Sequence, residues 1–244
     1  MKNRIWAFQI ASMLGLFALG CSDDNSTPSE PEDKITLADP TGVHEGHSYG
    51  EWAGEWWNWL YSNPASTNPA LDTTGEFANE NQTLDVFMLA GSFGSTESRS
   101  FTIPADMPVF FPITTTQADN CGVPVDMQLT NEELRAYAND SAAAVTELNL
   151  EIDGETFASS PEDFSDYLVP ATEMSYVVPA DDSLYDFQGS DFEGACSPSY
   201  TSGYFVMIEG LPAGEHTLHF SALTPGATPA DDFAIDVTDD ITAE

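Results

Sequence analysis

The aromatic side chains between residues 49 and 61 are the first candidates for chemistry in this sequence. Four of the five tryptophans lie between Trp52 and Trp59. At about 100° per residue, most of them share one face of a helix, a pattern typical of a buried stripe. Trp57 falls at the edge of that stripe, next to Tyr61. This pair is therefore our candidate platform for stacking against a sugar ring or another planar ligand, and core packing is the alternative.

Two carboxyl groups lie on the opposite side of the same predicted helix. Glu51 and Glu55 are four residues apart, so they share a helix face. Paired carboxyls carry out glycoside hydrolysis, which makes an extracellular polysaccharide hydrolase or lyase the alternative function. Two neighbouring acids are also expected by chance in a chain with 41 of them. The sequence has no nucleophile elbow and no glycine-rich phosphate loop, so it favours a non-catalytic protein.

Metal binding has two candidate segments. His44, Glu45 and His47 could together bind an ion, because two histidines three residues apart in a loop can chelate. His216 and His219 instead lie on a predicted strand and point to opposite faces. The acidic stretch 181–193 is the best place for Ca²⁺, although it lacks EF-hand spacing. Ordinary polar roles are the alternative for each. We predict no resident metal or cofactor, and calcium is the one ion left open.

The three cysteines divide into a lipid attachment site and a disulfide. Cys21 follows two basic residues and an apolar stretch of about 16 residues, which is shorter than a membrane span of about 20. The run 18–21 (Ala-Leu-Gly-Cys) resembles a lipobox, whose cysteine is acylated and becomes the new N-terminus; an ordinary cleaved signal peptide with an incidental cysteine is the alternative. Acyl chains such as palmitate would then anchor the protein to a bilayer. Cys121 and Cys196 remain, and in an oxidising compartment they are expected to form one disulfide.

The charge balance limits the partners. Removal of residues 1–20 takes two basic residues and no acid, so the formal charge goes from −36 to −38. Only Lys34, Arg99 and Arg135 remain as basic residues, which excludes nucleic acid as a partner. The acidity suits either a saline medium or cation binding. Both arginines are expected in structural ion pairs, with anion binding as the alternative.

The elements that must position these residues suggest one β-rich domain. Residues 1–20 are expected to be a lipoprotein signal peptide, 21–40 a flexible acidic tether and 41–244 the domain. Capping-box spacing predicts one helix from Ser48 to about residue 61 and a second over 131–145. The β-prone runs are 86–90, 98–103, 109–113, 146–152, 174–178, 204–209, 215–222 and 232–237. We expect an antiparallel β-sandwich or jelly roll with helices on one side.

Several motifs together resemble a widespread family of exported bacterial proteins that has no established activity. They are E-W-x-x-x-W-W-x-W at 51–59, N-P-x-x-D-x-T-G at 68–75, DVFMLAGSFG at 85–94, R-x-x-x-I-P-x-x-x-x-x-F-F-P at 99–112 and the hairpin at 203–222. The chain departs from the pattern where FMLAG replaces FLAG. The resemblance implies export and a single domain, and it supplies no catalytic residue.

These observations favour an exported lipoprotein that is fixed to the cell envelope through Cys21. Ser22, which is not Asp, follows the anchor and favours the outer membrane. The domain is expected to bind a glycan, a calcium-bridged partner or another envelope protein without catalysis. The hydrolase or lyase that uses carboxylates near the aromatic helix remains the alternative.

Overall fold

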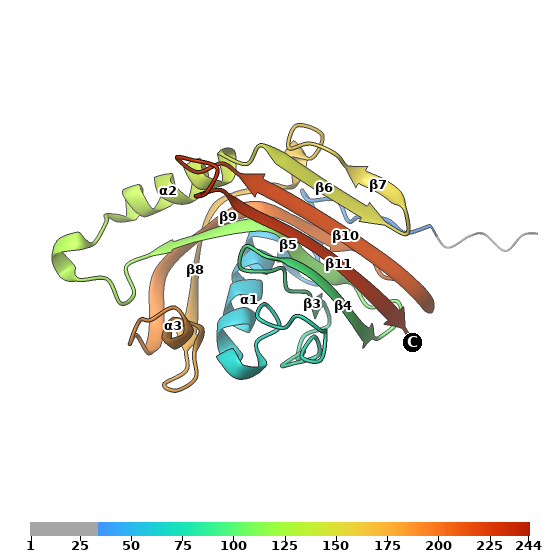
Figure 1. Ribbon diagram of the computed structural model, residues 1–244, viewed down its shortest axis with the longest axis horizontal. Helices are drawn as coiled ribbons and strands as arrows, with labels where there is room; N and C mark the ends of the chain where they lie inside the picture. Colours follow the sequence, from blue (N-terminus) through green and yellow to red (C-terminus); the bar gives the residue numbers. More distant parts are fainter. Residues whose placement is uncertain (1–33) are drawn as a thin grey trace, which may run out of the picture. The chain divides into compact units, whose positions relative to one another are not determined.

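The computed structural model describes residues 34–244, which are mainly β-strand. The predicted signal peptide, the Cys21 lipidation site and most of the predicted tether lie outside the described residues. Residues 35–244 form one compact unit. Its body consists of two stacked sheets, with one long helix packed on a face of the sheets and a second near one end, as Figure 1 shows. The expected mainly β, sandwich-like class is confirmed.

The first sheet has four strands in the order β3-β5-β9-β8. Their bounds are β3 (Phe87–Met88), β5 (Val109–Asp119), β9 (Gly194–Ile208) and β8 (Leu168–Val178). The second sheet has the order β4-β11-β10-β6-β7. Its strands are β4 (Thr96–Ile103), β11 (Phe233–Ala243), β10 (Gly214–Thr224), β6 (Glu147–Ile152) and β7 (Glu155–Ala158). A small hairpin of β1 (Val43–His44) and β2 (His47–Ser48) precedes the first helix.

The sheets are mixed, not purely antiparallel as expected. β3 pairs with β5 in parallel, and β4 pairs with β11 in parallel. The reason is that the consecutive strands β4 and β5 belong to different sheets. β5 therefore does not pair with β4 as a hairpin partner, and the C-terminal strand β11 pairs with β4 instead. All the predicted strand runs are found, most of them extended, whereas β1, β2 and β7 have no counterpart in the prediction.

β5 and β9 are buried on both faces, which explains their nearly continuous apolar runs. In β9, Val206 and Ile208 face the core between the two sheets, whereas Phe205 and Met207 face a second core on the other side. β5 alternates in the same way, with Phe111 in the first core and Phe110 in the second. The molecule therefore has three layers: the five-stranded sheet, the four-stranded sheet and the helix α1.

α1 (Tyr49–Ser62) covers the free face of the four-stranded sheet. The predicted capping box starts it: the Glu51 carboxylate accepts hydrogen bonds from the Ser48 backbone N–H and hydroxyl, both at 2.8 Å. α2 (Asn131–Ala143) packs on the opposite face, beyond the end of the five-stranded sheet, and starts with a capping box of Thr130 and Glu133. The short α3 (Leu184–Phe187) follows β8.

The folded unit begins earlier than the sequence suggests. Residues 35–40 belong to the predicted tether. In the structure, however, Leu37 pairs with Ile208, and the Ala38 N–H donates to the carbonyl of Met207 at 2.9 Å. Ala38 is buried, and Ile35 and Leu37 pack against the core between the sheets. These three side chains bury apolar surface, which stabilises the segment in its position beside the end of β9.

Candidate functional site

A groove of about 600 Å³ opens at one end of the sandwich. We call it the end groove. Its walls come from α1, β5, α2 and the ends of β10 and β11, which lie far apart in the sequence. The lining includes Trp57, Tyr61, Phe93, Thr114, Thr115, Thr116, Gln117, Tyr137, Asp140, Ser141, Gln188, Thr224 and Phe233. Aromatic rings therefore alternate with hydroxyl and amide groups, which is the composition of a site for an uncharged, hydroxyl-bearing ligand.

Trp57 lies in the wall of the end groove, where the protein holds it on several sides. Its indole N–H donates to the Thr201 hydroxyl at 2.8 Å, and its ring packs edge-on against Trp56 at 5.1 Å. Only 6% of the residue is exposed. The other three tryptophans of the helix donate to backbone carbonyls and are also buried. The aromatic stripe is thus part of the core, and Trp57 is the member that borders the groove.

Tyr61 lines the same groove and belongs to a cluster of tyrosines. Its ring stacks on Tyr176 with centroids 4.2 Å apart and lies against Trp57 at 5.6 Å and Tyr185 at 5.6 Å. Its hydroxyl donates to the Gln117 amide oxygen. Burial, and then the nearby Tyr185 and Asp119, raise the pKa of Tyr61 far above its ordinary value. Stacking of a ligand on Trp57 and Tyr61 stays a prediction; the structure shows that these rings already stack on protein partners.

Asp119 is the centre of the tyrosine cluster. Its carboxylate accepts from the Tyr176 hydroxyl at 2.6 Å, from the Ser199 hydroxyl at 3.2 Å and from the Cys121 backbone N–H at 2.8 Å. The Gln117 amide also donates to it. Through these donors the network connects Gln117, in the lining of the end groove, to the disulfide.

The predicted disulfide between Cys121 and Cys196 is confirmed. It joins the segment after β5 to the start of β9, with Cα atoms 5.8 Å apart. Within the described residues, the side chains of Asp119, Cys121 and Cys196 form the single group with metal-ligand proximity. Because the two sulfur atoms are bonded to each other, they are not available as the thiolates that metals require. The group therefore acts here as a covalent link beside the carboxylate.

Three exposed aromatic residues form the rim of the end groove, and sequence reasoning missed all of them. They are Phe93 (39% exposed), Tyr137 (57%) and Phe233 (42%). Large aromatic side chains usually lose contact with water on folding, so three of them around one hollow are notable. Phe93 follows the family-like LAG segment, Tyr137 lies in α2 and Phe233 begins β11. Phe93 lies within the DVFMLAGSFG motif, whereas Tyr137 and Phe233 belong to none, so no single motif signals the rim.

The carboxylates on α1 have different roles. Glu51 is occupied by the helix cap, and its hydrogen bonds with the Ser48 backbone and side chain lower its pKa against the opposing effect of burial. A general acid for glycoside hydrolysis needs a raised pKa, so this environment opposes such a role. Glu51 and Glu55 border a hollow of about 490 Å³ between α1 and β8, which shares no lining residue with the end groove.

Several of the candidate metal ligands contact other groups of the protein. His44 and His47 face each other across the β1–β2 hairpin, and their ring nitrogens contact the backbone carbonyls of Asp39 at 2.7 Å and Glu45 at 3.3 Å. In the acidic stretch, Asp186 completes the capping box of α3 and the Asp182 carboxylate accepts from Ser66.

The histidines of β10 lie on opposite faces, as expected. His216 contacts Asp153 at 2.7 Å, and His219 contacts Asp236 at 2.9 Å. Burial lowers the pKa of His216, but its hydrogen bonds to Asp153 and to the Pro212 carbonyl outweigh that effect and raise it.

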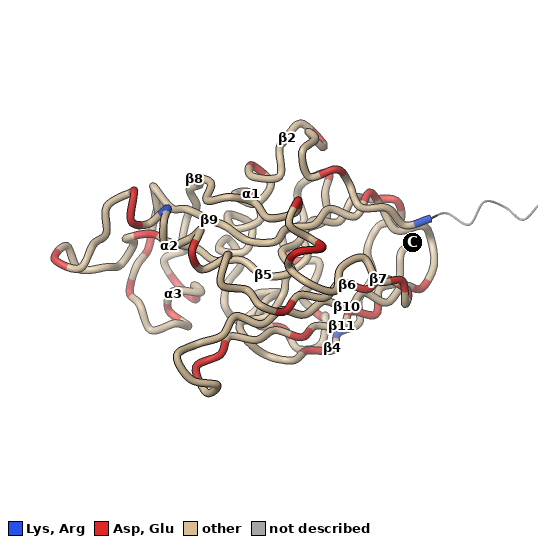
Figure 2. Tube along the Cα trace, turned by 90° about the horizontal axis from the view of Figure 1, so that it is seen from above, with Lys and Arg blue, Asp and Glu red and all other residues tan. Residues whose placement is uncertain are grey.

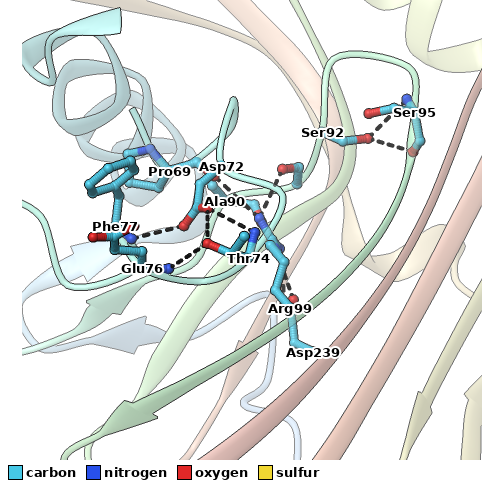
Figure 3. A network of polar contacts seen from close by, with 11 residues as sticks. Pro69, Asp72, Thr74, Glu76, Phe77, Ala90, Ser92, Ser95, Arg99 and Asp239 are labelled. Carbon is cyan, nitrogen blue, oxygen red and sulfur yellow. Dashed lines mark hydrogen bonds and ion pairs between the residues drawn. The ribbon is translucent and has the colours of Figure 1, made fainter. Parts of the chain in front are cut away.

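Arg99 organises the segments that carry the family-like motifs. Its guanidinium makes a two-pronged contact with the Asp239 carboxylate at 2.8 and 3.0 Å, and it donates to the carbonyl of Ala90 at 2.6 Å and to that of Pro69 at 3.3 Å. Figure 3 shows these bonds beside the turn in which Asp72 accepts from the backbone of the following residues. The structural ion pair expected for Arg99 is confirmed, and both of its charged residues are buried. Through its hydrogen bonds, Arg99 joins the segments that contain Pro69, Ala90 and Asp239.

Basic side chains are absent from the end groove among the described residues, and Asp140 is its carboxylate. Figure 2 shows the acidic residues spread over many loops and strands, with the few basic ones far apart. Arg135, on α2, lies 4.7 Å above the Tyr200 ring and 3.9 Å from Glu173, outside the groove. In the described part of the chain, no helix is both long and apolar enough to cross a bilayer.

Comparisons with known proteins add little to this geometry. No protein-family model matches the sequence, and no curated protein is similar to it. Among solved structures, the chain is similar to one titled "Solution Structure of Amebosin", with 12% sequence identity and a TM-score of 0.17. The alignment covers 60% of this chain and 96% of that chain. A TM-score of this size carries no argument about fold or function.

Proposed function

We propose that this protein is an exported lipoprotein, anchored through acylated Cys21, that binds an uncharged glycan in the end groove without catalysis. The observation that carries the proposal is the groove itself. Three exposed aromatic residues surround a floor of hydroxyl and amide groups, the combination that contacts both the faces and the hydroxyls of a sugar. Trp57 and Tyr61 supply the rigid inner wall.

Electrostatics support a neutral ligand. No described basic side chain lines the groove, and the mature chain carries a formal charge of −38 after loss of the two basic residues of the leader. An anionic polysaccharide would meet unfavourable potential both at Asp140 and at longer range. A neutral sugar chain has no such cost, because its hydroxyls can exchange hydrogen bonds with water for bonds with Thr116 and Gln188.

The expected location is supported by two independent features. The leader ending in Cys21 directs acylation, and the residue after it favours the outer membrane. The disulfide between Cys121 and Cys196 is the kind of link that persists outside a reducing cytoplasm. Together they support a location in the cell envelope.

Binding of neutral oligosaccharides by the mature lipoprotein in detergent tests the function. We expect millimolar to micromolar binding by calorimetry, and we expect Phe233→Ala and Tyr137→Ala each to weaken it about tenfold, the effect of losing one ring contact worth about 1.4 kcal/mol. Phe187→Ala is the matched control, because Phe187 is 62% exposed and does not line the groove. Equal weakening by the control would contradict the site.

The anchor has its own test. Intact mass measurement of the protein from membranes should show cleavage before Cys21 and the added mass of acyl chains. A chain that keeps Met1 and carries no lipid would refute the location.

A further inference from the structure

A second, smaller hollow opens beside the end groove, and we call it the apolar pit. Its floor and walls are formed by Trp56, Leu60, Ala70, Ile113 and Ile235. The pit and the end groove share the walls formed by Trp57, Phe93, Thr114, Thr115 and Phe233. The two hollows therefore lie next to each other.

The chemistry of the pit differs from that of the groove. Both indole N–H groups at the pit are already used, by the Leu89 carbonyl for Trp56 and by the Thr201 hydroxyl for Trp57. The Ser92 hydroxyl donates to the carbonyl of Ser95. A polar group that entered the pit would lose its bonds to water without replacement, so the pit selects an apolar group.

The volume of the pit sets the size of that group. At about 70 Å³, it has roughly half the volume of a cavity of about 150 Å³ that takes benzene. A methyl or isopropyl group fits this space, whereas an aromatic ring does not. The ligand portion in the pit is therefore a short aliphatic substituent.

The mouth of the pit has a polar group available. Thr114 borders both hollows, and its hydroxyl makes no hydrogen bond to any other described residue. A substituent with an amide next to its methyl group would place the methyl in the pit and the amide beside this hydroxyl. An acetamido group has this order of atoms.

We propose that the glycan bound in the end groove is an acetamido sugar whose methyl group occupies the apolar pit. This inference rests on the proposed function and adds the class of the ligand. It involves no covalent step. The pit acts as a specificity subsite, because it distinguishes sugars by one substituent.

Two oligosaccharides that differ only in that substituent test the proposal. The probes are β-1,4-linked tetramers of N-acetylglucosamine and of glucose, titrated into the mature lipoprotein in detergent. We expect the N-acetylglucosamine tetramer to bind at least about fourfold tighter, the ratio for burial of one methyl group. The Ala70→Val variant narrows the pit and should remove the preference between the two tetramers. Ala78→Val is the matched control, since Ala78 is equally buried but lies away from both hollows.

A second variant protects the test against a folding defect at Ala70. Thr114→Val keeps the shape of the wall and removes its hydroxyl, so it should reduce binding of the acetamido sugar more than that of the glucose tetramer. Thermal melting reports whether each variant is folded. Equal affinity for the two tetramers overturns the pit proposal and leaves glycan binding in the groove intact. Absence of binding by both tetramers counts against both proposals.

Discussion

Trp57 donates its indole N–H to the Oγ1 atom of Thr201 at 2.8 Å, across 144 positions of the chain. The same Oγ1 lies 3.0 Å from the hydroxyl of Thr115. These bonds connect α1, β9 and β5 at the base of the end groove. A ring at the edge of the aromatic stripe is thereby fixed in orientation, so the groove wall is preorganised before a ligand arrives.

Replacement of Thr201 by Val is expected to leave the Trp57 N–H without a partner. Because both groups are buried, the free energy of unfolding should fall by about 1–3 kcal/mol. Urea denaturation followed by tryptophan fluorescence measures the change. Thr217→Val on the exposed face of β10 is the control and should shift stability by less than about 0.5 kcal/mol. A neutral effect at position 201 would show that the bond does not hold the indole.

The buried pair of Arg99 and Asp239 gives a second prediction. Their side chains are 3% and 0% exposed, and each charge has the other as its ionic partner. Arg99→Leu should destabilise the fold by about 3–5 kcal/mol, because a carboxylate would remain buried without its cation. The double variant Arg99→Leu/Asp239→Leu should recover part of that loss. A double variant less stable than the two single effects combined would contradict this account.

Gly75 ends the D-x-T-G motif in a conformation reserved for glycine. Its φ is +94°, and a Cβ atom there would lie 2.5 Å from the carbonyl oxygen of Ser100. Gly75→Ala should therefore cost more than the usual strain of about 1–3 kcal/mol, because a backbone atom must also move. Gly154→Ala is the matched control, since Gly154 has φ +79° and open space around the Cβ position. Equal melting temperatures for the two variants would refute the steric argument.

His216 should make stability depend on pH. Its pKa is raised in the folded protein by Asp153 and the Pro212 carbonyl, against the effect of burial. The folded state therefore holds the proton more tightly than the unfolded state, and protonation stabilises the fold. This contribution is complete below the ordinary value of 6.5 and is lost as the pH rises through the raised value.

The measurement is the difference in unfolding free energy between the wild type and His216→Gln at several pH values. We expect the difference to shrink between pH 6 and the alkaline side of the raised pKa. Asp153→Asn should flatten the dependence in the same way. A difference that grows with pH has the opposite sign and would exclude the proposed linkage.

The sequence alone determined the features that depend on local chemistry. The capping boxes at Ser48 and Thr130 start both long helices. In each, a hydroxyl and a carboxylate three residues apart satisfy backbone N–H groups that have no partner in the first turn of a helix. Once Cys21 is assigned to lipid, Cys121 and Cys196 are the two remaining cysteines, so the sequence predicts one disulfide between them. The strand runs followed from apolar periodicity, although their direction of pairing did not.

The tertiary structure alone decided which side chains meet. Phe93, Tyr137 and Phe233 come together at the end groove because β4 and β5 separate into different sheets and β11 returns beside β4. That arrangement depends on the packing of two cores against the two faces of the four-stranded sheet. Its free energy is the sum of many contacts between residues that are far apart in the sequence. No short spacing in the chain records such a sum, so the exposed rim and the apolar pit could be seen only after folding placed their residues side by side.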